Sequence, residues 1–462
     1  MTLRAGIVAR DAMGSVGTGG FATLPGLVLV FYLTDTLGVA AIVAGVIVTA
    51  AKVWDVFVDP VIGAVSDREL ATTGGRRRLM AAGALLLPVF FTLTFWVPAG
   101  LPTPARAAWV LVAFVLAATA FSLFQVPYMA LPAELARSYD ERTRLLTARV
   151  VVLAAAILAF GGGAPALRGL GGDDERLGYL IMALAAGLLL GVGMFVAAGA
   201  ARGTPPAAAA AVPGDTRGGL SPAALVGHYR DGITVLRESA PFRALLATFV
   251  LQALATGVML AAAQYVATWV LHDTDAITPL FAALIAPALV CAPLWGRAAR
   301  RHGKERTFAV ASVLFGLAAI ALTGLAWVPG GWAYAAVGLA GAAYAGMQSL
   351  PMSMLPDVVA HDARVRGVDR AGRFGGVWTA GETGGLALGT TVLTIVLAVT
   401  GYAESTGSEQ VEQSTAAVLG IVASFSVIPA ILMVASLLTL RRYPLRRSDI
   451  DVPAVVVPEA RA

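Results

Sequence analysis

The sequence Lys52-Val-Trp-Asp55-Val-Phe-Val-Asp59-Pro60 places three ionisable side chains in the middle of an apolar segment, residues 39–65. That segment is long enough to cross a lipid bilayer as a helix. Residues 52, 55 and 59 are three and four positions apart, so they share one face of such a helix. A charge at the bilayer centre costs at least roughly 2.5–3.5 kcal/mol. Charges kept in this setting predict an ion-handling site inside a membrane protein.

The composition of the whole chain agrees with this setting. The 462 residues are 58% hydrophobic and only 13% charged, with a mean hydropathy of +0.78, whereas soluble domains carry about 25% charged residues. We expect an all-α membrane protein with twelve transmembrane helices. The expected spans are residues 12–34, 39–65, 79–98, 107–136, 145–166, 177–200, 243–271, 277–298, 305–328, 331–356, 375–401 and 414–440.

A tract rich in Pro, Gly and Ala divides the chain near its middle, and this composition is typical of a flexible linker. We expect an N-terminal six-helix bundle (residues 1–201), a cytoplasmic linker (202–240), a C-terminal six-helix bundle (241–442) and a disordered cytoplasmic tail (443–462). The halves also resemble each other. The fourth span ends Pro127-Tyr-Met-Ala-Leu-Pro-Ala-Glu134, and the tenth ends Pro351-Met-Ser-Met-Leu-Pro-Asp357. This repeat indicates an internal duplication, as in many secondary transporters.

The basic residues predict the orientation. Of the 33 Lys and Arg residues, 28 lie in the two terminal segments and in the even-numbered loops. The positive-inside rule then puts both termini in the cytoplasm of a multi-pass protein of the cell (inner) membrane. The net charge of +5 is explained by this topology, so we expect the lipid bilayer and a small solute as partners and no nucleic acid.

The sequence has no pattern typical of an enzyme. It has one cysteine, Cys291, and four histidines that lie outside the spans or near their ends. No Cys/His metal cluster, nucleophile elbow or phosphate-binding Lys-Ser/Thr motif is present. We therefore expect a monomeric, non-enzymatic protein that needs no cofactor beyond a coupling ion.

Several segments together resemble a known family. The loop Gly63-Ala-Val-Ser-Asp67-Arg68, continuing to Gly75-Arg-Arg77, resembles the major facilitator superfamily. Within it, the chain resembles the glycoside–pentoside–hexuronide:cation symporters, the group that contains melibiose permease and the animal lysolipid symporters. The segments that carry this likeness are Phe31-Tyr-Leu-Thr-Asp35, Lys52 to Pro60, Val126-Pro-Tyr128, Met354-Leu-Pro-Asp357 and Gly376-Val-Trp-Thr-Ala-Gly-Glu382. The resemblance implies two bundles that rock about a central site and carry a solute with Na⁺, Li⁺ or H⁺.

The resemblance also implies a cation site made by Asp55 and Asp59 with the hydroxyl of Ser122. These two acids would be metal ligands only if the ion were Na⁺. An alternative is a structural role, in which Lys52 forms a salt bridge that locks helices together. Val58 occupies a position that is often Asn in Na⁺-using members and offers no oxygen. Because hard cations need several oxygen ligands, this favours a proton.

Other charges form a predicted network. Arg149 in the fifth span is either a counter-charge that exchanges partners with Lys52, or a side chain that extends to the membrane surface. The family role of the Asp67-Arg68 turn is a charge-relay latch that holds one face closed.

The eleventh span carries another acid, Glu382. It is either a second protonation site or a buried acid hydrogen-bonded to Thr379 or Thr383. The resemblance places a lysine of the family at Thr383, so this chain departs from the pattern beside Glu382.

The predicted solute-contacting residues are aromatic, amide and thioether side chains: Gln125, Tyr128, Met129, Tyr265, Gln348 and Trp378. Each could instead pack inside the bundle. The sugar-binding acids of melibiose permease fall on Gly19 and Gln125, so this chain lacks them. We expect cation-coupled symport of a small solute such as a sugar or glycoside. The alternatives are a transporter or exporter of lysolipid-like amphiphiles, and a non-transporting receptor or scaffold.

Overall fold

The computed structural model describes residues 3–136, 139–201, 233–366, 370–406 and 411–445. Within these ranges the secondary structure is helical, and no strand is found there. Most of the predicted linker, residues 202–232, and most of the predicted tail, residues 446–462, lie outside the described residues.

The first half of the chain supplies six helical passes. The first consists of α1 (Ala5–Ala12), α2 (Gly14–Phe31) and the π-helical turn η1 (Tyr32–Thr36). The next three are α3 (Ala41–Thr73), α4 (Arg77–Phe95) and α5 (Thr103–Leu135). The fifth consists of α6 (Tyr139–Leu158), η2 (Ala159–Gly163), α7 (Ala164–Ala166) and η3 (Leu167–Gly171), and the sixth is α8 (Glu175–Ala198).

The second half repeats this plan. Its first two passes are α10 (Ala240–Tyr265) with η5 (Val266–Val270), and η6 (Thr274–Ala276) with α11 (Ile277–His302). The next two are α12 (Lys304–Ala321) with η7 (Leu322–Ala326), and α13 (Trp332–Arg366). The last two are α14 (Ala371–Val399), and α15 (Thr415–Phe425) with α16 (Val427–Leu440).

Eleven helical segments of the described chain are long and apolar enough to cross a membrane. The exception among the twelve predicted spans is residues 331–356, which coincide with α13. That helix has 35 residues, and glycine, tyrosine and polar residues such as Gln348 and Asp357 lower the hydrophobicity of its sequence. It packs against α11 and α12 within the second half.

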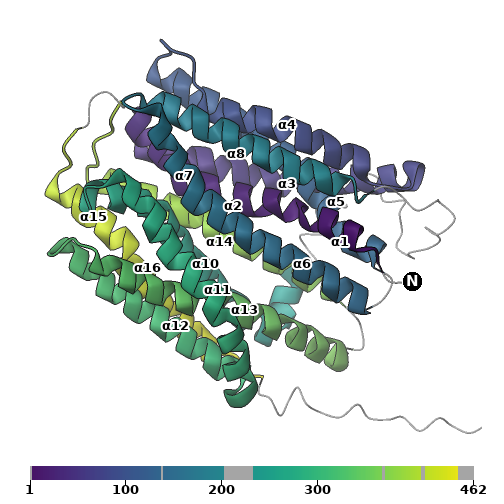
Figure 1. The fold of residues 1–462 in the computed structure, drawn as a ribbon. Helices are drawn as coiled ribbons and strands as arrows, with labels where there is room; N and C mark the ends of the chain where they lie inside the picture. Colours follow the sequence, from purple (N-terminus) through teal and green to yellow (C-terminus); the bar gives the residue numbers. More distant parts are fainter. Residues whose placement is uncertain (1–2, 137–138, 202–232, 367–369, 407–410, 446–462) are drawn as a thin grey trace, which may run out of the picture.

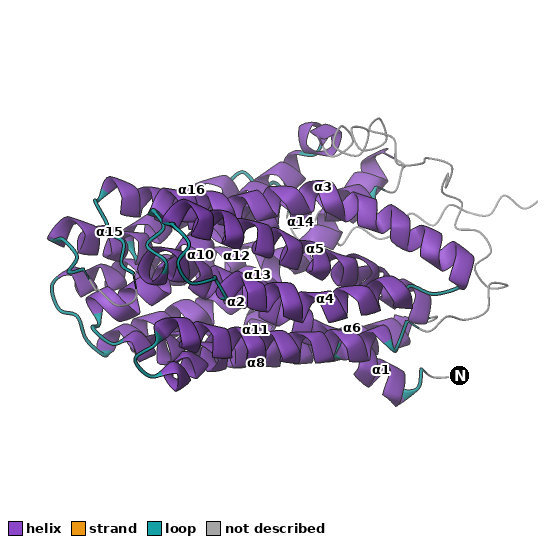
Figure 2. Cartoon of the chain, turned by 90° about the horizontal axis from the view of Figure 1, so that it is seen from above, coloured by secondary structure: helices purple, strands orange, loops and turns teal. Residues whose placement is uncertain are grey.

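Figures 1 and 2 show the long helices running side by side. The first half (purple to teal in Figure 1) lies beside the second (green to yellow). The N-terminus and α15 lie at opposite ends of the bundle in both views. We call these the α1 end and the α15 end. Many large apolar side chains are exposed, such as Val290 and Val399, as is typical of helices that face lipid.

The internal duplication predicted from the sequence is visible in two places. η1 and η5 each end the first pass of their half, and each is followed by a leucine and a residue with positive φ: Gly38 (+67°) and His272 (+54°). At the α1 end, Arg76 Nε donates to Glu134 Oε1 at 2.6 Å, and Lys304 Nζ donates to Asp357 Oδ2 at 2.5 Å. The two acids that looked equivalent in sequence therefore make equivalent ion pairs.

Glycines bring α14 close to α10. A Cβ atom on Gly385 would lie 2.9 Å from Ala253 Cβ, and one on Gly389 would lie 2.5 Å from the backbone of α10. Gly381 also faces α10. These three glycines are four residues apart, so they form one stripe along the helix. Gly384, on another face, has open space around it.

Candidate cation and solute site

The three charged residues of the opening motif lie near the middle of α3. With a rise of 1.5 Å per residue, α3 is about 50 Å long, and Asp55 and Asp59 flank its midpoint. Lys52 Nζ lies 3.3 Å from Asp55 Oδ2, and the two side chains are 32% and 16% exposed. The helical spacing thus brings the lysine to the first acid, one turn before the second.

Each acid keeps one oxygen without a partner. Oδ1 of Asp55 and Oδ1 of Asp59 are both buried and accept no hydrogen bond. Ser122 of α5 is buried, and its hydroxyl lies near the carboxylate of Asp59. A buried acceptor without a donor costs about 1–3 kcal/mol, and more when it is charged. Protonation of a carboxylate, or a bound cation, would remove this cost.

The structural alternative accounts for only part of this arrangement. Lys52 forms an ion pair with Asp55 and leaves Asp59 with a serine hydroxyl. If Lys52 served only to neutralise this face of the helix, the carboxylate of Asp59 would still lack a counter-charge. The described ranges hold no group of three or more His, Cys, Asp or Glu placed to bind a metal ion.

Arg149 makes a buried ion pair with a residue that the sequence did not single out. Its Nε and Nη2 donate to Asp11 Oδ2 and Oδ1 at 2.7 and 2.6 Å. Nη2 also donates to the backbone oxygen of Tyr128, and the guanidinium carbon lies 3.6 Å from the centre of the Tyr128 ring. Asp11 is fully buried. In this conformation Arg149 neither extends to the surface nor shares a partner with Lys52.

Asp67, one of the two residues of the predicted latch, forms an ion pair with Arg76. Asp67 Oδ1 accepts from Arg76 Nη2 at 2.7 Å, next to the bond from Arg76 to Glu134. Burial lowers the pKa of Arg76, but its bonds to Glu134 and Asp67 outweigh this and raise the pKa overall. Arg68, the other residue of the predicted turn, contributes its backbone oxygen to Thr72. Through Asp67 and Glu134, Arg76 therefore ties α3, α4 and α5 together within the first half.

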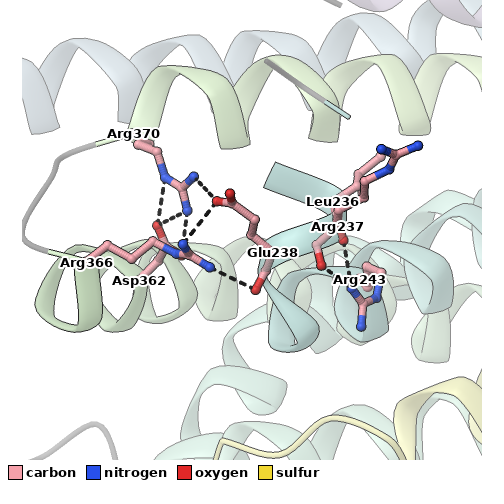
Figure 3. A network of polar contacts seen from close by, with 7 residues as sticks. All are labelled: Leu236, Arg237, Glu238, Arg243, Asp362, Arg366 and Arg370. Carbon is pink, nitrogen blue, oxygen red and sulfur yellow. Dashed lines mark hydrogen bonds and ion pairs between the residues drawn. The ribbon is translucent and has the colours of Figure 1, made fainter. Parts of the chain in front are cut away.

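A second charged cluster lies at the α1 end of the other half (Figure 3). Arg370 binds Asp362 at 2.8 Å and Glu238 at 2.7 Å, and Arg366 reaches the same two acids. Burial lowers the pKa of Arg370, and its two acidic partners raise it by more. Some basic residues that define the topology thus also join the start of α10 to α13 and α14.

The six predicted solute contacts do not gather in one open place. Tyr128 packs on Arg149, Tyr265 packs between Phe31 and Tyr402, and Trp378 stacks on Phe249. All three are buried. The other three are more accessible: Gln125 accepts from Thr18 at 2.7 Å, Gln348 donates to Tyr344, and Met129 is 65% exposed.

The first span has a glycine, Gly19, where the resemblance places a sugar-binding acid, and this glycine is closely packed. Gly19 is buried against α6, and a Cβ there would lie 3.0 Å from the backbone oxygen of Leu153. A carboxylate at this position would require the two helices to separate. The close packing is consistent with the loss of a sugar-binding acid at Gly19.

Sequence reasoning missed a polar cluster that joins the two halves at the α15 end. Tyr402 Oη donates to Asp35 Oδ1 at 2.6 Å, and Trp269 Nε1 donates to Tyr402 Oη at 2.7 Å. Thr34 Oγ1 lies 2.6 Å from Asp35 Oδ2 and 2.7 Å from Tyr265 Oη. We call these five residues the α15-end latch. Thr34 and Asp35 stood out in the sequence as part of a family segment without an assigned role, and Tyr265 stood out as a predicted solute contact.

Comparison with known proteins places this arrangement in a family. The family described as MFS/sugar transport protein matches residues 11–447, which is nearly the whole chain. The chain belongs to this family. It is accordingly a multi-pass membrane protein of a transporter family and not an enzyme.

Individual relatives match shorter segments. An uncharacterised symporter of Synechocystis sp. is 36% identical over 122 residues, which are 25% of this chain and 22% of the relative. The putative glycoside/cation symporter YagG of Escherichia coli is 29% identical over 152 residues, 33% of each chain. These matches thus span a third or less of the relatives' length. A crystal structure of a D-xylose-proton symporter shares the fold, with a TM-score of 0.68, 12% identity, and 95% and 97% of the two chains covered.

Proposed function

We propose that this protein is a secondary active transporter that moves a sugar or glycoside together with a cation. Asp55 and Asp59 bind the coupling ion, and Ser122 assists at Asp59. The observation that carries the proposal is the pair of buried Oδ1 atoms without partners, in the middle of a spanning helix where only one acid has a basic neighbour. Acids in this position usually serve an ion pathway.

The names of related proteins support the class of solute and the coupling. YagG is named a putative glycoside/cation symporter, and the solved structure with the same fold is named a D-xylose-proton symporter. We infer a proton as the coupling ion. Val58 adds no oxygen beside Asp59, where a hard cation favours several oxygen ligands and a proton needs only one acceptor.

Alternating access is supported by the position of the α15-end latch. If both termini lie in the cytoplasm of a bacterial inner membrane, the latch closes the outer side. A hydrogen bond between Thr34 and Tyr265 and one from Tyr402 to Asp35 join the two halves there. The described conformation is then closed to the outside, and opening requires these bonds to break.

The test uses purified protein in proteoliposomes. The external pH is recorded after each of a panel of sugars and lysolipids is added, with and without Na⁺. We expect a sugar to cause alkalinisation that does not need Na⁺. Asp59→Asn should abolish accumulation driven by the gradient but still allow exchange of solute, because exchange needs no net movement of the ion.

The matched control is Asp275→Asn, which removes an exposed carboxylate at the α15 end and should transport normally. Gradient-driven accumulation by both Asp55→Asn and Asp59→Asn at the normal level would contradict the proposal. Ion flux triggered by lysolipids alone would show that the solute class is wrong while the cation site stands.

A further inference from the structure

A small cavity lies inside the second half, between α10, α13 and α14. Its polar lining consists of Gln252, Thr256, Tyr344, Gln348 and Glu382, and Phe249 forms part of the apolar wall. The cavity measures about 10 Å³. This is close to the room that one water molecule needs, and far below the size of pockets for organic solutes.

Gln252 lines this cavity, and its side-chain oxygen has no donor. Its side chain is 2% exposed, and Nε2 donates to Ser312 Oγ at 2.8 Å and to Ser436 Oγ at 3.3 Å. Both serine hydroxyls donate their own protons to backbone oxygens. They can therefore only accept from Gln252, which fixes the amide with Oε1 turned away from them. That Oε1 atom is buried and without a partner.

The neighbouring groups are also mostly acceptors. Thr256 Oγ1 donates its proton to the backbone oxygen of Gln252 at 2.9 Å, which leaves only lone pairs. Gln348 Nε2 donates to Tyr344 Oη, which leaves the amide oxygen of Gln348. The hydroxyl proton of Tyr344 and the second Nε2 proton of Gln348 remain as donors.

Glu382 adds a carboxylate to this set of acceptors. The two threonines predicted as its partners, Thr379 and Thr383, are both exposed, and neither bonds to it in the described part of the chain. Tyr344 lies close enough to interact with it electrostatically, and Tyr344 is the only other titratable residue in the lining. The glycine stripe of α14 holds Glu382 beside α10, since Gly381 and Gly385 permit close contact there.

We propose that this cavity is a second site for a monovalent cation, H⁺ or Na⁺, in the C-terminal half. A carboxylate, two amide oxygens and a threonine hydroxyl line one small cavity, and only the Tyr344 hydroxyl and the second Nε2–H of Gln348 remain there as donors. A bound proton lets Glu382 donate to a neighbouring oxygen. Bound Na⁺ is ligated by the carboxylate, the two amide oxygens and the threonine hydroxyl. The site differs in location and residues from the α3 acids, and it predicts two ions per solute in a transporter of the proposed kind.

The experiment is independent of transport. Purified Asp55→Asn/Asp59→Asn protein lacks the α3 carboxylates and serves as the parent. Its melting temperature in detergent, without solute, is measured against Na⁺ concentration at pH 7.5 and against pH from 5 to 8 without Na⁺. A ligand that binds only the folded state raises the melting temperature.

If Na⁺ raises the melting temperature of the parent, and Glu382→Gln lowers the apparent affinity for Na⁺ at least tenfold, a sodium site is supported. If the melting temperature depends on pH but not on Na⁺, and Glu382→Gln removes this pH dependence, a proton site is supported. Gln348→Met, which removes one oxygen and leaves the carboxylate, should weaken either response less, and it serves as the test if Glu382→Gln does not fold. Asp275→Asn should behave as the parent. A parent that responds to neither ion, or a Glu382→Gln response equal to the parent's, overturns the proposal.

Discussion

The ion pair of Arg149 and Asp11 should be among the strongest tertiary contacts of the first half. Asp11 is 0% exposed and Arg149 is 7% exposed, and two hydrogen bonds of 2.7 and 2.6 Å join them. Arg149→Met leaves the carboxylate of Asp11 buried without its counter-charge. Removal of one partner of such a pair costs about 3–5 kcal/mol. The loss of the contact with the Tyr128 ring, at 3.6 Å, adds to this.

The double variant Asp11→Asn/Arg149→Met removes both charges, so it should be more stable than Arg149→Met alone. The free energy of unfolding can be measured by circular dichroism during SDS titration in mixed micelles. We expect a coupling energy of at least about 1.5 kcal/mol from the double-mutant cycle. A loss below about 1 kcal/mol for Arg149→Met, or additive losses in the cycle, would show that the pair is not closed in the membrane.

Two further substitutions test other contacts. Gly385→Val should destabilise the protein by about 1–3 kcal/mol because its Cβ meets α10. Gly384→Val, whose side chain enters open space, should not. Equal losses of stability for the two variants in the same SDS titration would contradict the role of the glycine stripe. Tyr402→Phe removes the donor to Asp35, so the α15 end should open about 5- to 150-fold more often. Distances between spin labels on the two halves would report this opening, and an unchanged distribution would contradict it.

The sequence predicted well what depends on hydrophobicity and local spacing. The spans follow from long apolar stretches, and the contact of Lys52 with Asp55 follows from their separation of three residues. The partner of Arg149 could not be read in the same way. Asp11 is 138 positions away and lies at the edge of a predicted span, where a charged residue normally faces the membrane surface.

The burial of Tyr128, Tyr265 and Trp378 also required the structure. Helices such as α5 and α10 are apolar on nearly every side, so their sequence pattern does not fix which face turns inward. The rotation of each helix is set by close contacts between chain segments far apart, such as that of Gly385 with α10. The same contacts place Glu382 next to Gln252, a neighbourhood that no spacing rule could predict.

The α15-end latch has a consequence for biosynthesis. Asp35 is translated 367 residues before Tyr402, the phenol that donates to it. At roughly 5–20 residues per second, the ribosome needs about 20–70 s to reach that tyrosine. During this interval Asp35 can accept from its neighbour Thr34 but not from Tyr402. The first and last parts of the chain are therefore joined at this end only after nearly all of it has been made.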